Sequence, residues 1–114
     1  MTRPTMYAPT KAYRVGRATE NKARAVLHRA GFVTLRSWMS LSPADLVALR
    51  AGTVPWLIQV KKGGYMPPAE RVALLAMAAQ AGALPVLCRM ESDGTLTFHV
   101  MTGAGVRDLQ EMEP

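Results

Sequence analysis

The sequence predicts a single α/β domain with a central mixed β-sheet of about five strands flanked by helices. The chain has 114 residues, helical and extended patterns alternate along it, and no repeat or linker divides it. A chain of this length has the size of one domain and can bury roughly two-thirds of its unfolded surface. The expected order is one helix, three strands, a second helix and two strands.

The first helix is expected over residues 15–30, where apolar residues recur at helical spacing and Gly31 is a typical stop. Glu20 lies two turns before Leu27, so its carboxylate should point towards the sheet. The alternative is an ordinary first-turn glutamate that the helix dipole favours. Residues 1–12 show no period and are expected to form a flexible arm.

The remaining elements follow from short apolar runs separated by turn signals. Strands are expected at 32–36, 44–49, 56–60, 84–90 and 95–100, and a helix at 69–81 between Pro68 and Gly82. Cys88 and His99 fall inside strands and are interpreted as structural residues. The acidic tail, residues 103–114, is expected to be frayed or to form a short helix.

Polar residues interrupt the two runs that should form a hairpin. Asp45 breaks the first run, while Gln59 and Lys61 break the second. Side chains alternate between the faces of a strand, so Gln59 and Lys61 share one face. In an antiparallel hairpin, Asp45 can converge with them on that face. Burying such groups is costly unless they have partners, which a metal ion and a phosphate would supply.

The charge of the chain is unevenly distributed. The net charge is +6, and residues 1–62 carry eleven Lys and Arg against two acids, whereas residues 63–114 carry three against six. A basic half of this kind indicates a polyanionic partner, most simply nucleic acid. A merely solvated basic surface is the alternative. Both acids of the basic half, Glu20 and Asp45, fall in segments with predicted structure.

Several classes of protein are excluded by composition. A single cysteine rules out an internal disulfide or a cysteine-rich zinc site, and the two histidines follow no ligand spacing. No run is long and apolar enough to cross a membrane, and the first residues lack the apolar core of a signal peptide. The sequence therefore predicts a soluble intracellular protein, located in the cytoplasm.

The polar residues of the hairpin suit the hydrolysis of a phosphodiester. Mg²⁺ acidifies bound water, neutralises phosphate charge and prefers oxygen ligands. Asp45 offers a carboxylate, Gln59 an amide oxygen and Val60 a backbone carbonyl. Lys61 would orient or deprotonate the attacking water, or stabilise the developing charge. Glu20 would hold a metal-bound water or a second metal, and Mn²⁺ is expected to substitute for Mg²⁺.

Six stretches of the sequence together have a familiar pattern: GRATE (16–20), AGFVTLRS (30–37), ADLVAL (44–49), LIQVKK (57–62), AGALPVLCRM (81–90) and TLTFHV (95–100). Through them the chain resembles the archaeal-type Holliday junction resolvases of the PD-(D/E)xK nuclease superfamily. It implies a restriction-endonuclease-like fold and a nuclease domain over residues 13–102. It also implies a Mg²⁺ site and a homodimer that nicks opposite strands of a four-way DNA junction.

Carried over to this sequence, the resemblance implies a set of site residues. The helix acid is Glu20, the strand acid Asp45 and the lysine Lys61, with Gln59 completing the motif. The basic residue that closes the first strand is Arg36. The assisting loop serine is assigned to Ser40, and the alternatives are Ser37 and Ser42.

Two positions depart from the family's pattern. Gln59 stands where the family usually has a glutamate, which removes a negative charge from the metal site. Glu20-Asn21-Lys22 stands where a glutamate-arginine-glutamate motif is usual. Because Asp45 and Lys61 are kept, the site is expected to be active. Whether Gln59 lowers metal affinity stays open.

The resulting hypothesis is a Mg²⁺-dependent, structure-selective DNA endonuclease without a small-molecule substrate. DNA phosphates would be bound by basic residues, namely Arg14, Arg17, Arg24, Arg36 and Lys62. The apolar helix at 70–81 would form the dimer interface, unless its breadth reflects ordinary core packing. Two alternatives remain: a related nuclease acting on other branched or duplex DNA, and an inactive junction-binding module.

Overall fold

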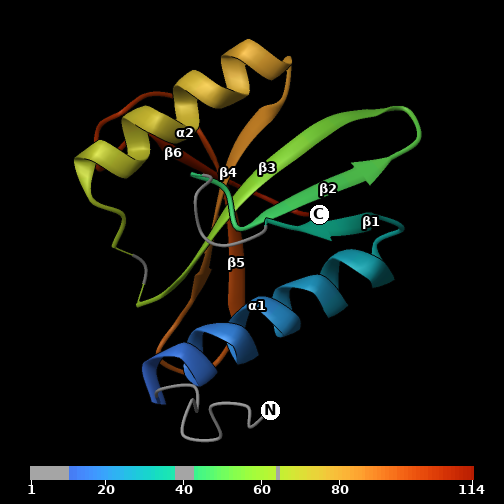
Figure 1. The fold of residues 1–114 in the computed structure, drawn as a ribbon, viewed down its shortest axis with the longest axis vertical. Helices are drawn as coiled ribbons and strands as arrows, with labels where there is room; N and C mark the ends of the chain where they lie inside the picture. The colour runs from blue at the N-terminus through green and yellow to red at the C-terminus, as the bar shows by residue number, and fades with distance from the viewer. Residues whose placement is uncertain (1–10, 38–42, 64) are drawn as a thin grey trace, which may run out of the picture.

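The computed structural model describes residues 11–37, 43–63 and 65–114, which fold around one mixed β-sheet (Figure 1). Within these residues two helices and six strands follow one another: α1 (Lys11–Arg29), β1 (Val33–Arg36), β2 (Leu46–Arg50), β3 (Thr53–Lys62), α2 (Pro68–Ala81), β4 (Leu84–Met90), β5 (Leu96–Met101) and β6 (Leu109–Met112). The strands lie in the sheet in chain order. The predicted α/β class is confirmed, with one strand more than expected.

Neighbouring strands pair in antiparallel fashion except β3 and β4, which run parallel. Parallel neighbours need a crossover connection, and α2 provides it, as in a βαβ unit. The expected hairpin forms between β2 and β3, with Leu46 opposite Ile58 and Val47 opposite Leu57. This pairing places the predicted polar positions of both strands at the same end of the sheet.

The two helices cover opposite faces of the sheet (Figure 1). On one face Leu27 of α1 packs with Leu46 and Ile58, all fully buried. On the other face Leu74 of α2 packs with Leu57 and other buried residues. Burying one such side chain stabilises the fold by roughly 1.5–3 kcal/mol, so the two clusters fix both helices against the sheet.

Helix α1 begins at Lys11, four residues before the predicted start. Residues 11 and 12 of the expected arm therefore belong to the helix, and residues 1–10 lie outside the described residues. His28 and Arg29 occupy its last turn, where the helix dipole favours cations. Gly31 then adopts a φ of 92°, a left-handed conformation that only glycine adopts at little cost.

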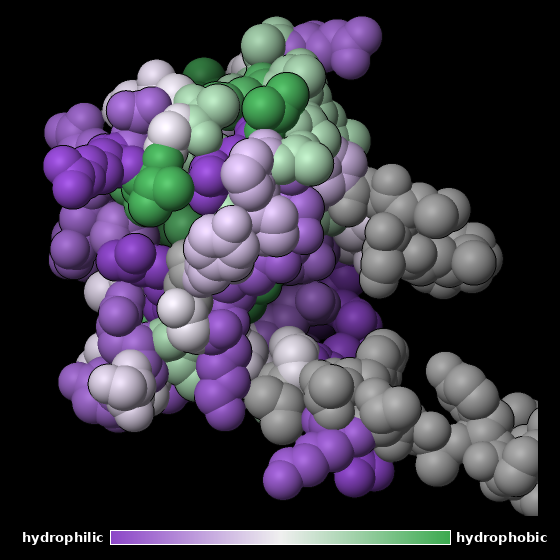
Figure 2. All heavy atoms as spheres, turned by 90° about the vertical axis from the view of Figure 1, so that its left-hand side faces the viewer, coloured by the Kyte–Doolittle hydropathy of each residue, from purple (hydrophilic) through white to green (hydrophobic). Residues whose placement is uncertain are grey.

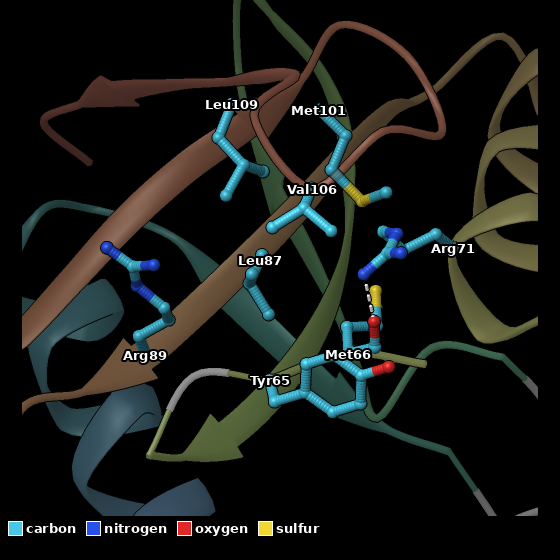
Figure 3. Close-up of a pocket in the computed structure, with 8 residues that line it drawn as sticks. All are labelled: Tyr65, Met66, Arg71, Leu87, Arg89, Met101, Val106 and Leu109. Carbon is cyan, nitrogen blue, oxygen red and sulfur yellow. Dashed lines mark hydrogen bonds between the residues drawn. The ribbon is translucent and has the colours of Figure 1, made fainter. Parts of the chain in front are cut away.

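Helix α2 agrees with the sequence prediction. It begins after Pro67 and ends at Gly82, which has a φ of 65° and donates its N–H to carbonyls of the last turn. Arg71 in its first half is buried, and its guanidinium donates to the backbone carbonyls of Met66 and Ala104 (Figure 3). The Nε–O distance to Ala104 is 2.8 Å. Arg71 thereby connects the start of α2 to the loop before β6.

The expectation of a frayed or helical tail is wrong. Leu109–Met112 forms β6, which pairs with β5 so that Met101 lies opposite Leu109 and Phe98 opposite Met112. The strand was missed because it is short and carries two polar residues, Gln110 and Glu111, on its exposed positions. Pairing with β5 holds β6 in an extended conformation that its own sequence does not strongly favour.

The interpretation of Cys88 and His99 as structural agrees with their burial. Cys88 is fully buried in the α1-side core, and His99 is buried with its Nε2 3.0 Å from the Thr97 hydroxyl. Within the part of the chain that the structure describes, no helix is long and apolar enough to cross a membrane.

Candidate functional site

The candidate site lies at one end of the sheet, where β1 ends, β2 begins and β3 ends. The backbone N–H of Ser37 donates to the carbonyl of Asp45, and the N–H of Asp45 donates to the carbonyl of Ile58, both over 2.8 Å. The Asp45 carboxylate accepts the N–H of Val60 over 2.8 Å through Oδ2. The aspartate predicted from the hairpin is therefore attached to β3 by main chain and side chain.

The environment of Asp45 disfavours its charge. Burial raises the pKa of this carboxyl, while the hydrogen bond from Val60 opposes the rise. The negative charges of Glu20 and Glu70 raise the pKa of Asp45 further, and the positive charge of Lys61 lowers it. Together these effects leave the pKa of Asp45 above its ordinary value. A cation beside Asp45 would stabilise the ionised carboxylate, because the protein alone does not fully compensate its negative charge.

Gln59 and Lys61 lie on the face of β3 that α2 covers. They alternate with Ile58 and Val60, which pack into the core on the α1 side. Lys61 Nζ lies 2.8 Å from Glu70 Oε1, with side-chain exposures of 25% and 42%. The lysine of the predicted motif is therefore held by a carboxylate from the first turn of α2.

Glu20 reaches the sheet, as its position on the helix predicted. Its Oε1 lies 2.5 Å from Nε of Arg36, the last residue of β1. The two side chains are 16% and 31% exposed, so this ion pair is half-buried between α1 and β1. Both partners were predicted as functional residues, one for the metal and one for DNA, and the structure joins them to each other.

The predicted DNA-binding cations lie on α1, at the end of β1 and at the end of β3. Arg24 donates from Nε to the Thr34 hydroxyl over 3.0 Å, and Arg36 is paired with Glu20. Arg14 is exposed and Arg17 half-buried on α1, and Lys62 is exposed at the end of β3. The predicted serine Ser40 and its alternative Ser42 lie outside the described residues.

Two residues near Lys61 were not predicted from the sequence. Glu70 is the partner of Lys61, and Arg89 lies opposite Lys61 in the parallel register of β3 and β4. The Arg89 Nε is buried and has no hydrogen-bond partner within the described residues, although Glu91 Oε2 is 3.4 Å away. An arginine inside the apolar run of 84–90 was the available signal for the second of these residues.

The donors at this site suit a hard cation. No group of three histidine, cysteine, aspartate or glutamate residues gathers to hold a metal within the described ranges. Mg²⁺ does not require such a group, because it is commonly held by one or two carboxylates and keeps several waters. The Asp45 carboxylate and the Gln59 amide are oxygen donors, and burial disfavours the negative charge of Asp45 unless a cation compensates it. These residues fit a partly hydrated divalent cation.

A small pocket lies on the α2 side of the sheet (Figure 3). Arg71, Leu87, Met101 and Leu109 contribute to its wall, and Arg71 points towards Met66. The two arginines that border it, Arg71 and Arg89, come from α2 and β4. Its largely apolar lining and small size fit packing of the last strands against α2.

Comparison with known proteins gives one informative result. No protein-family model matches the sequence, and no curated protein sequence matches it significantly. Among solved structures it is similar to Hjc from Archaeoglobus fulgidus, a Holliday junction resolvase from an archaeal hyperthermophile. The TM-score is 0.64 at 24% identity, over 74% of this chain and 70% of that chain.

The chain has the fold of this resolvase. The restriction-endonuclease-like architecture expected from the resemblance is therefore confirmed, with its mixed sheet between two helices.

Proposed function

We propose that the protein is a Mg²⁺-dependent, structure-selective DNA endonuclease that resolves four-way junctions by paired nicks from a homodimer. The observation that carries the proposal is the attachment of Asp45 to Val60 on β3, the strand of Gln59 and Lys61. The fold likeness to a Holliday junction resolvase supports the same class of substrate. Metal dependence, dimerisation and the paired nicks belong to this proposal.

The residues of the cluster divide the chemistry between them. Asp45, Gln59 and the Val60 carbonyl would hold Mg²⁺, or Mn²⁺ in its place, which supplies an acidified water and neutralises phosphate charge. Lys61 provides an ammonium that orients the attacking water and stabilises charge on the phosphate. Glu20, held by Arg36, keeps a negative charge near Asp45 from the α1 side. Ser40, which lies outside the described residues, stays the proposed assisting serine.

DNA would be bound through its phosphates. Arg14, Arg17 and Lys62 present positive charge on α1 and at the end of β3, and Arg89 of β4 stands opposite Lys61 in the strand register. Phosphate contacts fix the position of a duplex without reading its sequence, so the shape of the junction would be recognised. Because such a substrate is DNA inside a cell, we place the protein in the cytoplasm, which is that of the host if the protein is viral.

The outer face of α2 supports a homodimer. Val72 on this face is 56% exposed, and the alanines around it are exposed as well. Figure 2 shows hydrophobic spheres gathered at the top of the molecule, where α2 lies, above a largely hydrophilic lower part. Only part of the apolar surface of α2, around Leu74, packs on the sheet. A second copy of the chain would cover the rest of the apolar surface of α2. The dimer would then contain two candidate active sites, as the cutting of two DNA strands requires.

The decisive experiment is nicking of a labelled immobile four-way junction beside a linear duplex of matched sequence, with Mg²⁺ or EDTA. The proposal expects symmetric cuts on opposing strands of the junction, in Mg²⁺ alone. Cuts in every substrate would identify a general nuclease of the same fold. Binding without cuts in Mg²⁺ or Mn²⁺ would identify an inactive junction-binding module. Sedimentation of the free protein tests the homodimer separately.

A further inference from the structure

The cation site, as predicted from the sequence, is short of negative charge. Gln59 is neutral, and Glu20 is engaged in a half-buried ion pair with Arg36. Among the residues of the β2–β3 hairpin and its entry, Asp45 is the one acid. A divalent ion held by a single carboxylate beside Lys61 would face an unfavourable charge balance, since the ammonium repels it.

The first turn of α2 brings a further carboxylate to the same place. Glu70 Oε1 lies 2.8 Å from Nζ of Lys61, the residue that directly follows Val60 on β3. Glu70 is 42% exposed, which leaves part of its carboxylate open to solvent. Asp45, which is hydrogen-bonded to Val60, and Glu70, which is paired with Lys61, therefore contact consecutive residues of β3 from two different elements.

Glu70 is held in position by its neighbours. Met66, just before the helix, and Leu74, one turn after Glu70, are almost fully buried. The adjacent Arg71 is buried and bonded to the carbonyls of Met66 and Ala104. A carboxylate on a helix fixed in this way is better placed to bind an ion than one on a loop.

The simplest explanation of the Lys61–Glu70 pair is an ordinary surface ion pair. Such pairs stabilise proteins by only about 0–1 kcal/mol, and a glutamate in a first helical turn is favoured by the helix dipole in any case. Neither effect requires that the pair sit directly beside the Asp45–Val60 hydrogen bond. The position of Glu70 against Lys61, two residues after Gln59, calls for a functional explanation.

We propose that Glu70 is the second carboxylate of the divalent-cation site, and that with Asp45 it supplies the negative charge that Gln59 lacks. This inference rests on the proposed nuclease function, whose site it completes. In the protein without a cation, Lys61 balances Glu70. The charge that the strand motif lacks is thus provided by a residue eleven positions later, on the crossover helix.

The test is a charge exchange between the two positions, measured first as cation binding without DNA. Mg²⁺ and Mn²⁺ are titrated calorimetrically into the wild type and into Asp45→Asn, Glu70→Gln and the double variant Gln59→Glu/Glu70→Gln. Glu70→Gln should weaken binding about tenfold or more, as Asp45→Asn does, given the usual effect of losing a metal-site residue. The double variant should return to within about threefold of the wild type. Glu113→Gln, with the same charge change beyond β6, should bind as the wild type does.

Unchanged affinity in Glu70→Gln would overturn the inference, and so would a double variant that binds as weakly as Glu70→Gln alone. Lys61→Met provides a second test if Glu70→Gln does not fold. Removing the ammonium frees Glu70, so cation binding should tighten several-fold, and weaker or equal binding would contradict the inference. Thermal melting in EDTA establishes that each variant is folded.

Junction nicking by the same variants separates this inference from the proposed function. If the wild type binds the cation through Glu70 yet cuts no DNA, the nuclease proposal fails and the cation site stands. If the wild type cuts junctions and Glu70→Gln keeps both affinity and nicking, the nuclease proposal stands and the role of Glu70 fails.

Discussion

The Asp45 carboxylate accepts the backbone N–H of Val60 over 2.8 Å, which joins the residue just before β2 to the last part of β3. From the sequence, Asp45 is a candidate ligand for its charge and Val60 for its carbonyl. The structure adds that the N–H of Val60 holds the carboxylate in place. Because this bond is made within the protein, the position of Asp45 does not depend on a bound ion.

Asp45→Asn should abolish metal-dependent nicking while keeping the fold. The asparagine amide oxygen can still accept the N–H of Val60, so the local geometry should survive. Loss of the charge should lower the rate of junction nicking about 100-fold or more, as is usual when a group at a metal site is removed. Nicking kinetics measure the first effect and circular dichroism the second; an unaltered rate would exclude Asp45 from the site.

The same variant should be more stable than the wild type at neutral pH in EDTA. Burial raises the pKa of Asp45, so the folded state keeps the Asp45 proton to a higher pH than the unfolded chain does. Stability is therefore lost as the pH rises from the ordinary value of 3.8 through the raised pKa, and the loss persists above it. Asparagine has no such loss. Melting temperatures at neutral pH and below pH 3.8 should show the advantage of Asp45→Asn only at the higher pH.

Gln59→Glu should keep or raise nicking and lower the Mg²⁺ concentration that half-maximal activity needs. A carboxylate in place of the amide adds negative charge to the face that carries Lys61 and lies near Glu70. A several-fold shift is expected because another charged oxygen favours a hard cation. Metal titrations of nicking provide the measurement, with Gln80→Glu on the exposed end of α2 as control. Complete loss of cleavage would show that position 59 has a different role.

Lys62 and Arg24 should differ in their effect on DNA binding. Lys62 is exposed, so Lys62→Gln should weaken junction binding and reduce the slope of log affinity against log salt by about one phosphate contact. Arg24 is bonded to Thr34, so Arg24→Gln should chiefly lower the melting temperature. Fluorescence anisotropy at several salt concentrations measures the slopes. Equal slopes for Lys62→Gln and the wild type would remove Lys62 from the interface.

Arg71→Met should destabilise the protein by about 3 kcal/mol. The change leaves the carbonyls of Met66 and Ala104 without their charged donor, and each such bond contributes about 1.5–3 kcal/mol. Urea unfolding measures the loss, and hydrogen exchange should show faster opening of residues 102–108. Arg107→Met, an exposed arginine of the same loop, is the matched control and should change stability little.

Cys88 should be unreactive in the folded protein. Burial raises the pKa of its thiol from 9.0 to about 12, so the reactive thiolate is scarce at neutral pH and access is closed. A thiol reagent at pH 8 should label it only after denaturant is added. The folded state keeps the Cys88 proton to a higher pH than the unfolded chain does, so the free energy of unfolding should fall as the pH rises from 9 towards 12. The Cys88→Ala variant should not show this fall. Rapid labelling of the native protein would contradict the prediction.

Much of the fold was predictable because its signals are local. The periodicity of α1, the Pro68 and Gly82 ends of α2, and the two interrupted apolar runs of the hairpin all lie within short stretches of chain. The hairpin partners are close in sequence, so their pairing follows from a short turn. Strand β6 was missed because its order comes from β5 and not from its own polar residues.

The helices, the hairpin and the residue types at its polar end, Asp45, Gln59 and Lys61, could be predicted from local patterns in the chain. Their partners depend on tertiary packing. Glu70 reaches Lys61 because the crossover helix returns over β3, and Arg89 lies beside Lys61 because β3 and β4 are parallel in one particular register. Such contacts depend on how separate elements pack and pair. No periodicity within either element encodes them.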